Sequence, residues 1–175
     1  MSRPRIALIA DPTSPEGCRE YLAEAVELLT GTPPVRVDSR HFEAGGGGQA
    51  QREDGRLRLR VPEERLDLVP DVVVLYEIPP HRRAALADFQ LLLEECDVVT
   101  LGTGPDAWRT ATEKNLTVER FRRDGIAQMD TVVLSAPTEN EARDAFEELG
   151  GDTWARPVVG TGGNDTFHVN SLERL

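Results

Sequence analysis

Residues 71–76 read Asp-Val-Val-Val-Leu-Tyr (DVVVLY) and give the strongest strand signal in the chain. A continuous β-branched run of this kind is typical of a parallel strand that is buried on both faces. Similar apolar runs lie at residues 5–10 (RIALIA) and 98–101, and helical patterns at residues 14–29 and 82–96 alternate with the three runs. Strands that alternate with helices predict a doubly wound, Rossmann-like parallel sheet over residues 1–104.

Both helical patterns have an apolar face that we expect to pack on this sheet. In the first helix the apolar residues are Tyr21, Leu22, Ala25, Leu28 and Leu29. In the second helix they are Leu86, Phe89, Leu92 and Leu93.

The segment between these elements has its own pattern. A short strand is expected at residues 35–37, a flexible loop at Gly45–Gly48, and a hairpin at residues 51–61 with Asp54-Gly55 at its turn. In the hairpin Leu57, Leu59 and Val61 alternate with Arg56, Arg58 and Arg60. The arginines could form an anion site, but a solvated strand face is the favoured interpretation.

After Pro105 the pattern changes to β-α-β-β, which predicts a smaller α+β lobe at residues 105–175. Its helices are expected at residues 113–124, ended by Gly125, and at residues 139–149, where Thr138 and Glu141 match a capping box. Its strands are expected at residues 131–135, 153–159 and 165–169.

Composition limits the classes of partner. The 175 residues include 31 acidic and 20 basic side chains, a net charge of −11, which disfavours broad binding to nucleic acids or anionic membranes. No apolar run approaches the roughly 20 residues of a membrane span, and the apolar run Ile6–Ala10 is too short for a secretory signal. Cys18 and Cys96 lack metal-site spacing. We expect reduced cysteines in a cytoplasmic protein.

The basic residues are 19 Arg and a single Lys, Lys114. Further along, residues 155–163 read ARPVVGTGG, so Arg156 precedes a glycine-rich loop. Glycines allow backbone N–H groups to approach phosphate oxygens closely. The loop does not match a Walker A motif, which continues into a helix. Taken alone, it is also compatible with a plain hairpin turn.

Lys114 at a helix start and Arg156 beside the glycine loop occur in an order that resembles the ATP-grasp family, and within it the glutathione synthetase and RimK-like ligases. The resemblance covers roughly residues 97–169. Glu113-Lys114 resembles the acidic-Lys pair of the first grasp lobe, and Gly125-Ile126 before residues 131–133 resembles the passage from helix to strand. ARPVVGTGG resembles the Lys-Pro-x-x-Gly-x-Gly-Gly element.

The resemblance implies that Lys114 and Arg156 hold the phosphates of ATP under a flap of Gly160, Thr161, Gly162 and Gly163. It implies ATP-dependent ligation of a small-molecule or peptide carboxylate to an amine through an acyl phosphate, with Mg²⁺. The sequence departs from the family at Arg156, where Lys is usual. The adenine hinge and the magnesium ligands are expected in a C-terminal lobe outside these residues. The rest of a longer polypeptide, a partner chain or a homo-oligomer would supply that lobe, without which we expect no catalysis.

Two further points stay open. The first domain of such ligases contributes to the second-substrate site, where Arg82 and Arg83 could lie; an ordinary strand-to-helix connection is the favoured alternative. A non-catalytic nucleotide- or partner-binding module, derived from half of an ATP-grasp protein, and a pure α/β interaction protein compete with the ligase hypothesis.

Overall fold

The computed structural model describes residues 3–14, 17–102, 104–160, 163 and 165–174. The chain divides into two compact units, Met1–Trp108 and Arg109–Leu175, which we call the N-terminal and C-terminal units. The sequence had suggested a boundary after residue 104. No described helix is long and apolar enough to cross a membrane.

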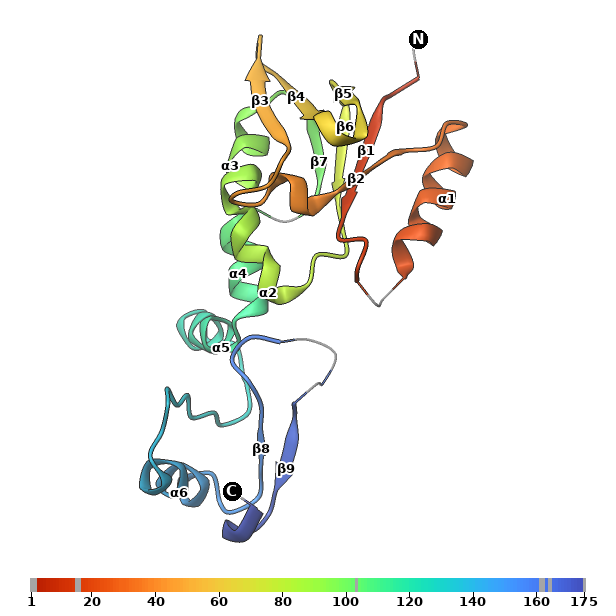
Figure 1. Ribbon diagram of the computed structural model, residues 1–175. Helices are drawn as coiled ribbons and strands as arrows, with labels where there is room; N and C mark the ends of the chain where they lie inside the picture. Colours follow the sequence, from red (N-terminus) through yellow and green to blue (C-terminus); the bar gives the residue numbers. More distant parts are fainter. Residues whose placement is uncertain (1–2, 15–16, 103, 161–162, 164, 175) are drawn as a thin grey trace. The chain divides into compact units, whose positions relative to one another are not determined.

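The N-terminal unit is built on a four-stranded parallel sheet (Figure 1). Its strands are β1 (Ile6–Ala10), β2 (Val35–Asp38), β6 (Val72–Leu75) and β7 (Val99–Leu101), in the order β2-β1-β6-β7. The parallel sheet expected from the apolar runs is therefore present. The central strands β1 and β6 are the most apolar, because both of their faces are covered.

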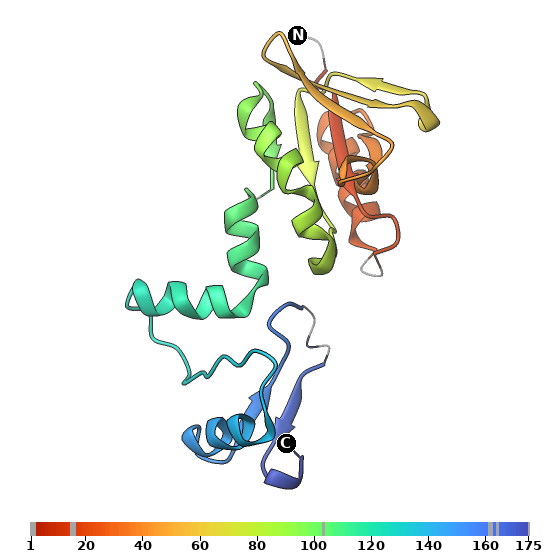
Figure 2. The ribbon, with the colours of Figure 1, turned by 60° about the vertical axis from the view of Figure 1, so that its left-hand side comes forward.

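Helices lie on both faces of this sheet (Figures 1 and 2). Helix α1 (Cys18–Thr30) packs Ala23 and Leu22 against Leu8 and Val74. The other face carries α2 (Pro80–Arg83), a 3-10 turn η3 (Ala84–Leu86) and α3 (Ala87–Glu95), where the sequence predicted one continuous helix. Leu86, Phe89 and Leu93 point into the core as expected.

The prediction for the face of α1 was mostly wrong. Tyr21, Leu28 and Leu29 are 74%, 86% and 87% exposed, although they were expected in the core. The apolar arc of this helix is wider than the strip that one sheet can cover. The small residue Ala23 allows close approach to the sheet, so the arc around it is buried and the other part is left outside.

A second, antiparallel sheet fills the connection from β2 to β6. The chain passes through η1 (Ser39–Phe42), β3 (Gln49–Glu53), β4 (Arg56–Val61), η2 (Pro62–Glu64) and β5 (Leu66–Leu68), and the order is β3-β4-β5. The expected hairpin is present, but the sequence analysis missed β5. Leu57, Leu59 and Val61 are completely buried in the same core as α3.

The arginines of β4 occupy the opposite face. Arg58 pairs with Glu53 and Asp67, and Arg60 also pairs with Glu53. Arg56 pairs with Asp71. Carboxylates of the same unit pair with all three guanidinium groups, and the three arginine side chains are partly exposed, which agrees with a solvated strand face.

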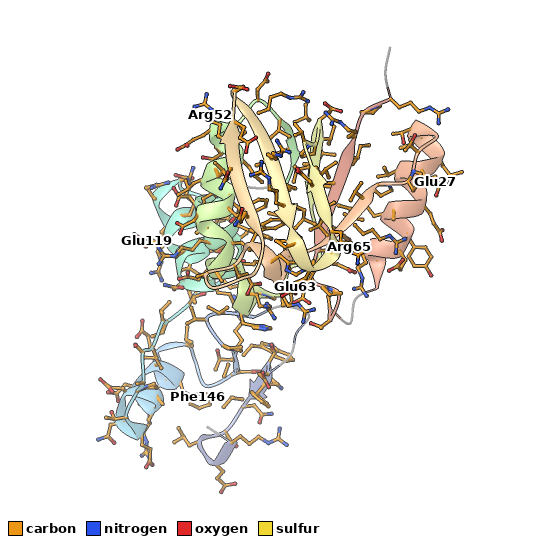
Figure 3. All side chains as sticks on the ribbon, turned by 45° about the horizontal axis from the view of Figure 1, so that its top comes forward. Glu27, Arg52, Glu63, Arg65, Glu119 and Phe146 are labelled. Carbon is orange, nitrogen blue, oxygen red and sulfur yellow. The ribbon has the colours of Figure 1, made fainter. Side chains whose placement is uncertain are left out.

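The C-terminal unit contains helices and a strand pair. After α4 (Pro105–Thr112), which crosses the boundary, come α5 (Lys114–Arg123), α6 (Glu139–Glu148), β8 (Thr153–Ala155), β9 (Phe167–Val169) and η4 (Leu172–Arg174). Helix α4 was not predicted. The capping box of Thr138 and Glu141 begins α6 as predicted. In both views α6 lies beside the β8–β9 pair (Figures 1 and 2). Its Phe146, labelled in Figure 3, is buried.

The strand predicted at residues 131–135 is absent; these residues form an irregular segment. A β-branched run becomes a strand only where a neighbouring edge accepts its hydrogen bonds, and β8 and β9 pair only with each other among the described residues. Both of these strands are shorter than predicted. Pro157, which lacks an N–H donor, follows closely on the end of β8.

Candidate functional site

Lys114 and Arg156 line one cavity of about 740 Å³ in the C-terminal unit. Helix α5 forms one wall with Lys114, Thr117, Val118 and Phe121. Thr153 and Trp154 of β8, followed by Arg156, form another. The structure therefore brings together two predicted cations that lie far apart in the sequence.

Backbone contacts explain how the two motifs meet. The N–H of Lys114 donates to the carbonyl of Val158 (2.9 Å), and Glu113 forms an isolated antiparallel bridge with Val159. The first turn of α5 is thus attached to the segment between Arg156 and the glycine loop. Because the first N–H groups of a helix lack partners inside it, the start of α5 is suited to such a contact.

The Lys114 ammonium is held inside this arrangement. Its Nζ donates a hydrogen bond to the carbonyl oxygen of Gly160 (3.1 Å). Burial lowers the pKa of Lys114 below its ordinary value, and the positive charge of Arg156 lowers it further. Both effects disfavour the charged ammonium, so an anion that enters this cavity would relieve them.

The glycine loop is partly described. A Cβ atom at Gly160 would lie 3.4 Å from Cγ of Pro157 and 3.7 Å from Nζ of Lys114, so a side chain there would be in van der Waals contact with the ammonium. Gly163 has φ of +73°, a conformation that favours glycine. Thr161 and Gly162 lie outside the described residues.

Trp154 is a feature of the cavity that the sequence analysis missed. Its ring stacks on His168 (centroids 4.9 Å apart), and Nε2 of His168 lies 2.6 Å from Oδ1 of Asp152. Trp154 is nevertheless 61% exposed and lines the cavity. An aromatic residue two positions before Arg156 was the available signal, since alternate residues of a strand share a face.

Metal ligands were expected outside this chain. Among the described residues, no group of three or more His, Cys, Asp or Glu side chains is placed to hold a metal ion. The carboxylates that line the cavity are Asp130 and Asp152.

Arg82 and Arg83 lie in the N-terminal unit, and both have partners there. Arg82 donates two hydrogen bonds to the carboxylate of Glu43 (2.9 and 2.7 Å) and lies 3.5 Å from Oδ2 of Asp11. Arg83 donates to the carbonyl of Ile78 (2.9 Å) and stacks over the ring of Trp108. Their contacts fix the connection that follows β6.

Asp11 and Glu77 follow the two central strands at the carboxyl edge of the sheet. Burial alone would raise the pKa of Asp11, but hydrogen bonds from Thr13 and the charge of Arg82 outweigh it and hold that pKa below 3.8. Glu77 has φ of +53°, an uncommon conformation outside glycine. Its carboxylate accepts from the N–H of Cys18 at the start of α1 and from Arg19 (3.1 Å). Glu77 thereby ties the end of β6 to α1.

Comparison with known proteins places the fold. No family model and no curated protein matches the chain. Among solved structures, D-alanyl-alanine synthetase A from Vibrio cholerae is similar with a TM-score of 0.71 and 18% identity, over 99% of this chain and 54% of that chain. The D-alanine-D-alanine ligase from Aeromonas hydrophila gives 0.60 and 18%, over 89% and 54%. The enzyme from Coxiella burnetii gives 0.57 and 14%, over 99% and 56%.

These similar structures are ligases of the ATP-grasp superfamily. The chain has a mixed α/β fold that matches part of such a ligase, and it spans about half the length of the solved chains that it matches. At these identities the likeness concerns the fold.

Proposed function

We propose that this chain is the ATP-binding part of an ATP-grasp carboxylate–amine ligase. One observation carries the proposal: Lys114 and Arg156 line one cavity, and Lys114 donates a hydrogen bond to the carbonyl of Gly160, in a chain whose fold matches part of D-alanine-D-alanine ligases. Two cations beside a glycine-rich loop suit a polyphosphate.

In the proposed complex, Lys114 and Arg156 bind the phosphates of ATP. The glycine loop, Gly160 to Gly163, covers them and limits access of water. The exposed face of Trp154 is available to a base, since aromatic rings stack on nucleobases. Mg²⁺, held by ligands outside the described residues, would reduce the charge repulsion of the phosphates.

The chemistry that follows from this proposal is carboxylate activation. The terminal phosphoryl group of ATP passes to a carboxylate oxygen, and an amine then displaces phosphate from the acyl phosphate, which forms the amide bond. A C-terminal lobe, in the same polypeptide or in a partner, would complete the site. The proposed substrate is the carboxylate of an amino acid or of a peptide. An amino acid agrees with the names of the similar solved structures. A peptide agrees with a RimK-like or glutathione synthetase-like ligase. A cytoplasmic location belongs to the same proposal.

The N-terminal unit is proposed to contribute to the second-substrate site at the carboxyl edge of its parallel sheet. Arg82 and Arg83 lie there, in the connection after β6. Because Arg82 and Arg83 both bind other groups of the N-terminal unit, we propose that they determine the conformation of the chain at this edge.

A non-catalytic nucleotide-binding module is the second candidate. The observation that favours it is Arg156, which stands where the resemblance calls for Lys. A planar guanidinium binds phosphate well but approaches it along a different path.

The single lysine offers a direct test. In the full chain labelled with ¹³C at lysine Cε, one resonance reports on Lys114 alone. We expect saturable movement of this resonance on titration with Mg-ATP, and the same titration of an Arg156→Gln variant should need more nucleotide. An unmoved resonance at millimolar Mg-ATP would remove both nucleotide-binding proposals. A second assay adds amino acids and the C-terminal lobe and measures phosphate release. Nucleotide binding without phosphate release would favour the non-catalytic nucleotide-binding module.

A further inference from the structure

Helix α1 carries an apolar stripe on the side that faces away from the sheet. We call Tyr21, Ala25, Leu28 and Leu29 the outer stripe. These residues are spaced i, i+4, i+7 and i+8, so they lie along one side of the helix. All four are exposed, and the two leucines are exposed by more than four fifths.

This exposure is unusual in degree. Isolated apolar residues are common on protein surfaces, whereas contiguous apolar patches are typical of surfaces that bind a partner. The sheet already holds the opposite side of α1 through Ala23 and Leu22. The outer stripe is therefore apolar surface beyond what the core of the N-terminal unit uses.

Acidic side chains border the stripe on one flank. Glu20 faces β2, where it pairs with Arg36. Glu24 and Glu27, further along the same flank, are exposed (Glu27 is labelled in Figure 3) and form no ion pair with any other described residue. The apolar stripe thus has two carboxylates beside it that are available to a cationic partner.

We propose that the outer stripe binds an amphipathic helix of another protein, with an apolar face bordered by Lys or Arg. Its apolar face would cover Leu28, Leu29 and Tyr21, and its basic border would meet Glu24 and Glu27. Helix pairs commonly combine an apolar seam with charges at its flanks in this way. The proposal does not rest on the proposed function.

Charge argues against a second copy of this chain as the occupant. An antiparallel pairing of two α1 helices about Ala25 would bring Glu24 of each copy close together. The net charge of −11 adds general repulsion between copies. The acidic flank likewise disfavours an anionic lipid surface.

The test uses a fluorescent synthetic helix about five turns long, with leucines on one face and lysines at its borders. A matched peptide carries glutamates in place of the lysines. Binding to the full chain is followed by fluorescence anisotropy, for the wild type and for a Leu28→Ser/Leu29→Ser variant. Leu91→Ser is the control, since Leu91 is an exposed leucine on α3. Circular dichroism shows whether each variant keeps the fold.

We expect the lysine-bordered peptide to bind the wild type and the Leu91→Ser control equally. The double leucine variant should bind it roughly tenfold more weakly or worse, since two apolar contacts are lost. Glu24→Gln/Glu27→Gln should weaken binding and reduce its dependence on salt.

Equal affinity of the double leucine variant and the wild type would overturn the proposal, as would equal affinity for the two peptides. Sedimentation would overturn it too, if the wild type were a dimer that the double variant converted to a monomer, because a second copy would then occupy the stripe. Stripe-dependent binding to phosphatidylcholine vesicles, in place of the peptide, would assign the stripe to lipid.

Discussion

Replacement of Lys114 by Met isolates the contribution of one ammonium group to nucleotide binding. Methionine keeps most of the aliphatic stem and removes the charge. In the free protein the ammonium bonds to the Gly160 carbonyl. It is disfavoured by burial and by Arg156, which together lower its pKa. These effects oppose each other, so we expect the free energy of unfolding to change by less than about 1 kcal/mol.

The effect of Lys114→Met on the affinity for Mg-ATP should be larger than its effect on stability, and it should be a loss. Binding exchanges a hydrogen bond to a neutral carbonyl, worth about 1 kcal/mol, for one to a charged phosphate, worth about 1.5–3 kcal/mol. The net loss in Lys114→Met is then about 0.5–2 kcal/mol, which corresponds to roughly 2- to 30-fold weaker binding.

Isothermal titration with Mg-ATP measures this loss, and urea denaturation measures stability in parallel. Arg143→Met is the matched control, because it removes a cation from α6 outside the cavity. Unchanged affinity in Lys114→Met, or an equal loss in Arg143→Met, would refute the assignment of Lys114 to the phosphates.

Two other predictions concern the N-terminal unit. Because the pKa of Asp11 is lowered below its ordinary value, its carboxylate contributes stability that is fully present well above that ordinary value and is lost as the pH falls through the lowered pKa. Asp11→Asn should therefore lower the free energy of unfolding by about 1–3 kcal/mol near neutral pH. Its difference from the wild type should shrink in acid; urea denaturation at several pH values checks this, and a constant difference would contradict it. Leu59 is completely buried, so Leu59→Ala should cost about 2–5 kcal/mol. Leu91→Ala, at a half-exposed position, should cost much less in the same assay, and equal costs would show that Leu59 does not belong to the core.

Sequence reasoning worked best where a single local pattern determines the structure. The buried run at residues 71–76 became β6, and the alternation in residues 56–61 became β4 with its leucines inside. The capping box at Thr138 and Glu141 is likewise a local arrangement. None of these depends on distant residues.

The errors arose where distant residues decide the outcome. The periodicity of α1 was correct, but the sheet selects which part of its apolar arc is buried, and Leu28 and Leu29 are outside. The run at residues 131–135 has strand propensity without a strand to pair with. Trp154 belongs to no motif; its sequence signal is its position two residues before Arg156, and the structure shows that it lines the cavity.

The position of β1 in the middle of the parallel sheet bears on the order in which the N-terminal unit folds. Ile6 pairs with Val72, while the β3–β4 hairpin pairs residues close together in sequence, such as Glu53 and Arg56. Pairings of long sequence separation form slowly, because loop closure opposes them. We therefore expect the hairpin to form early. The pairing of β1 with β6 should be the last that β1 makes, because the ribosome synthesises the residues of β6 much later.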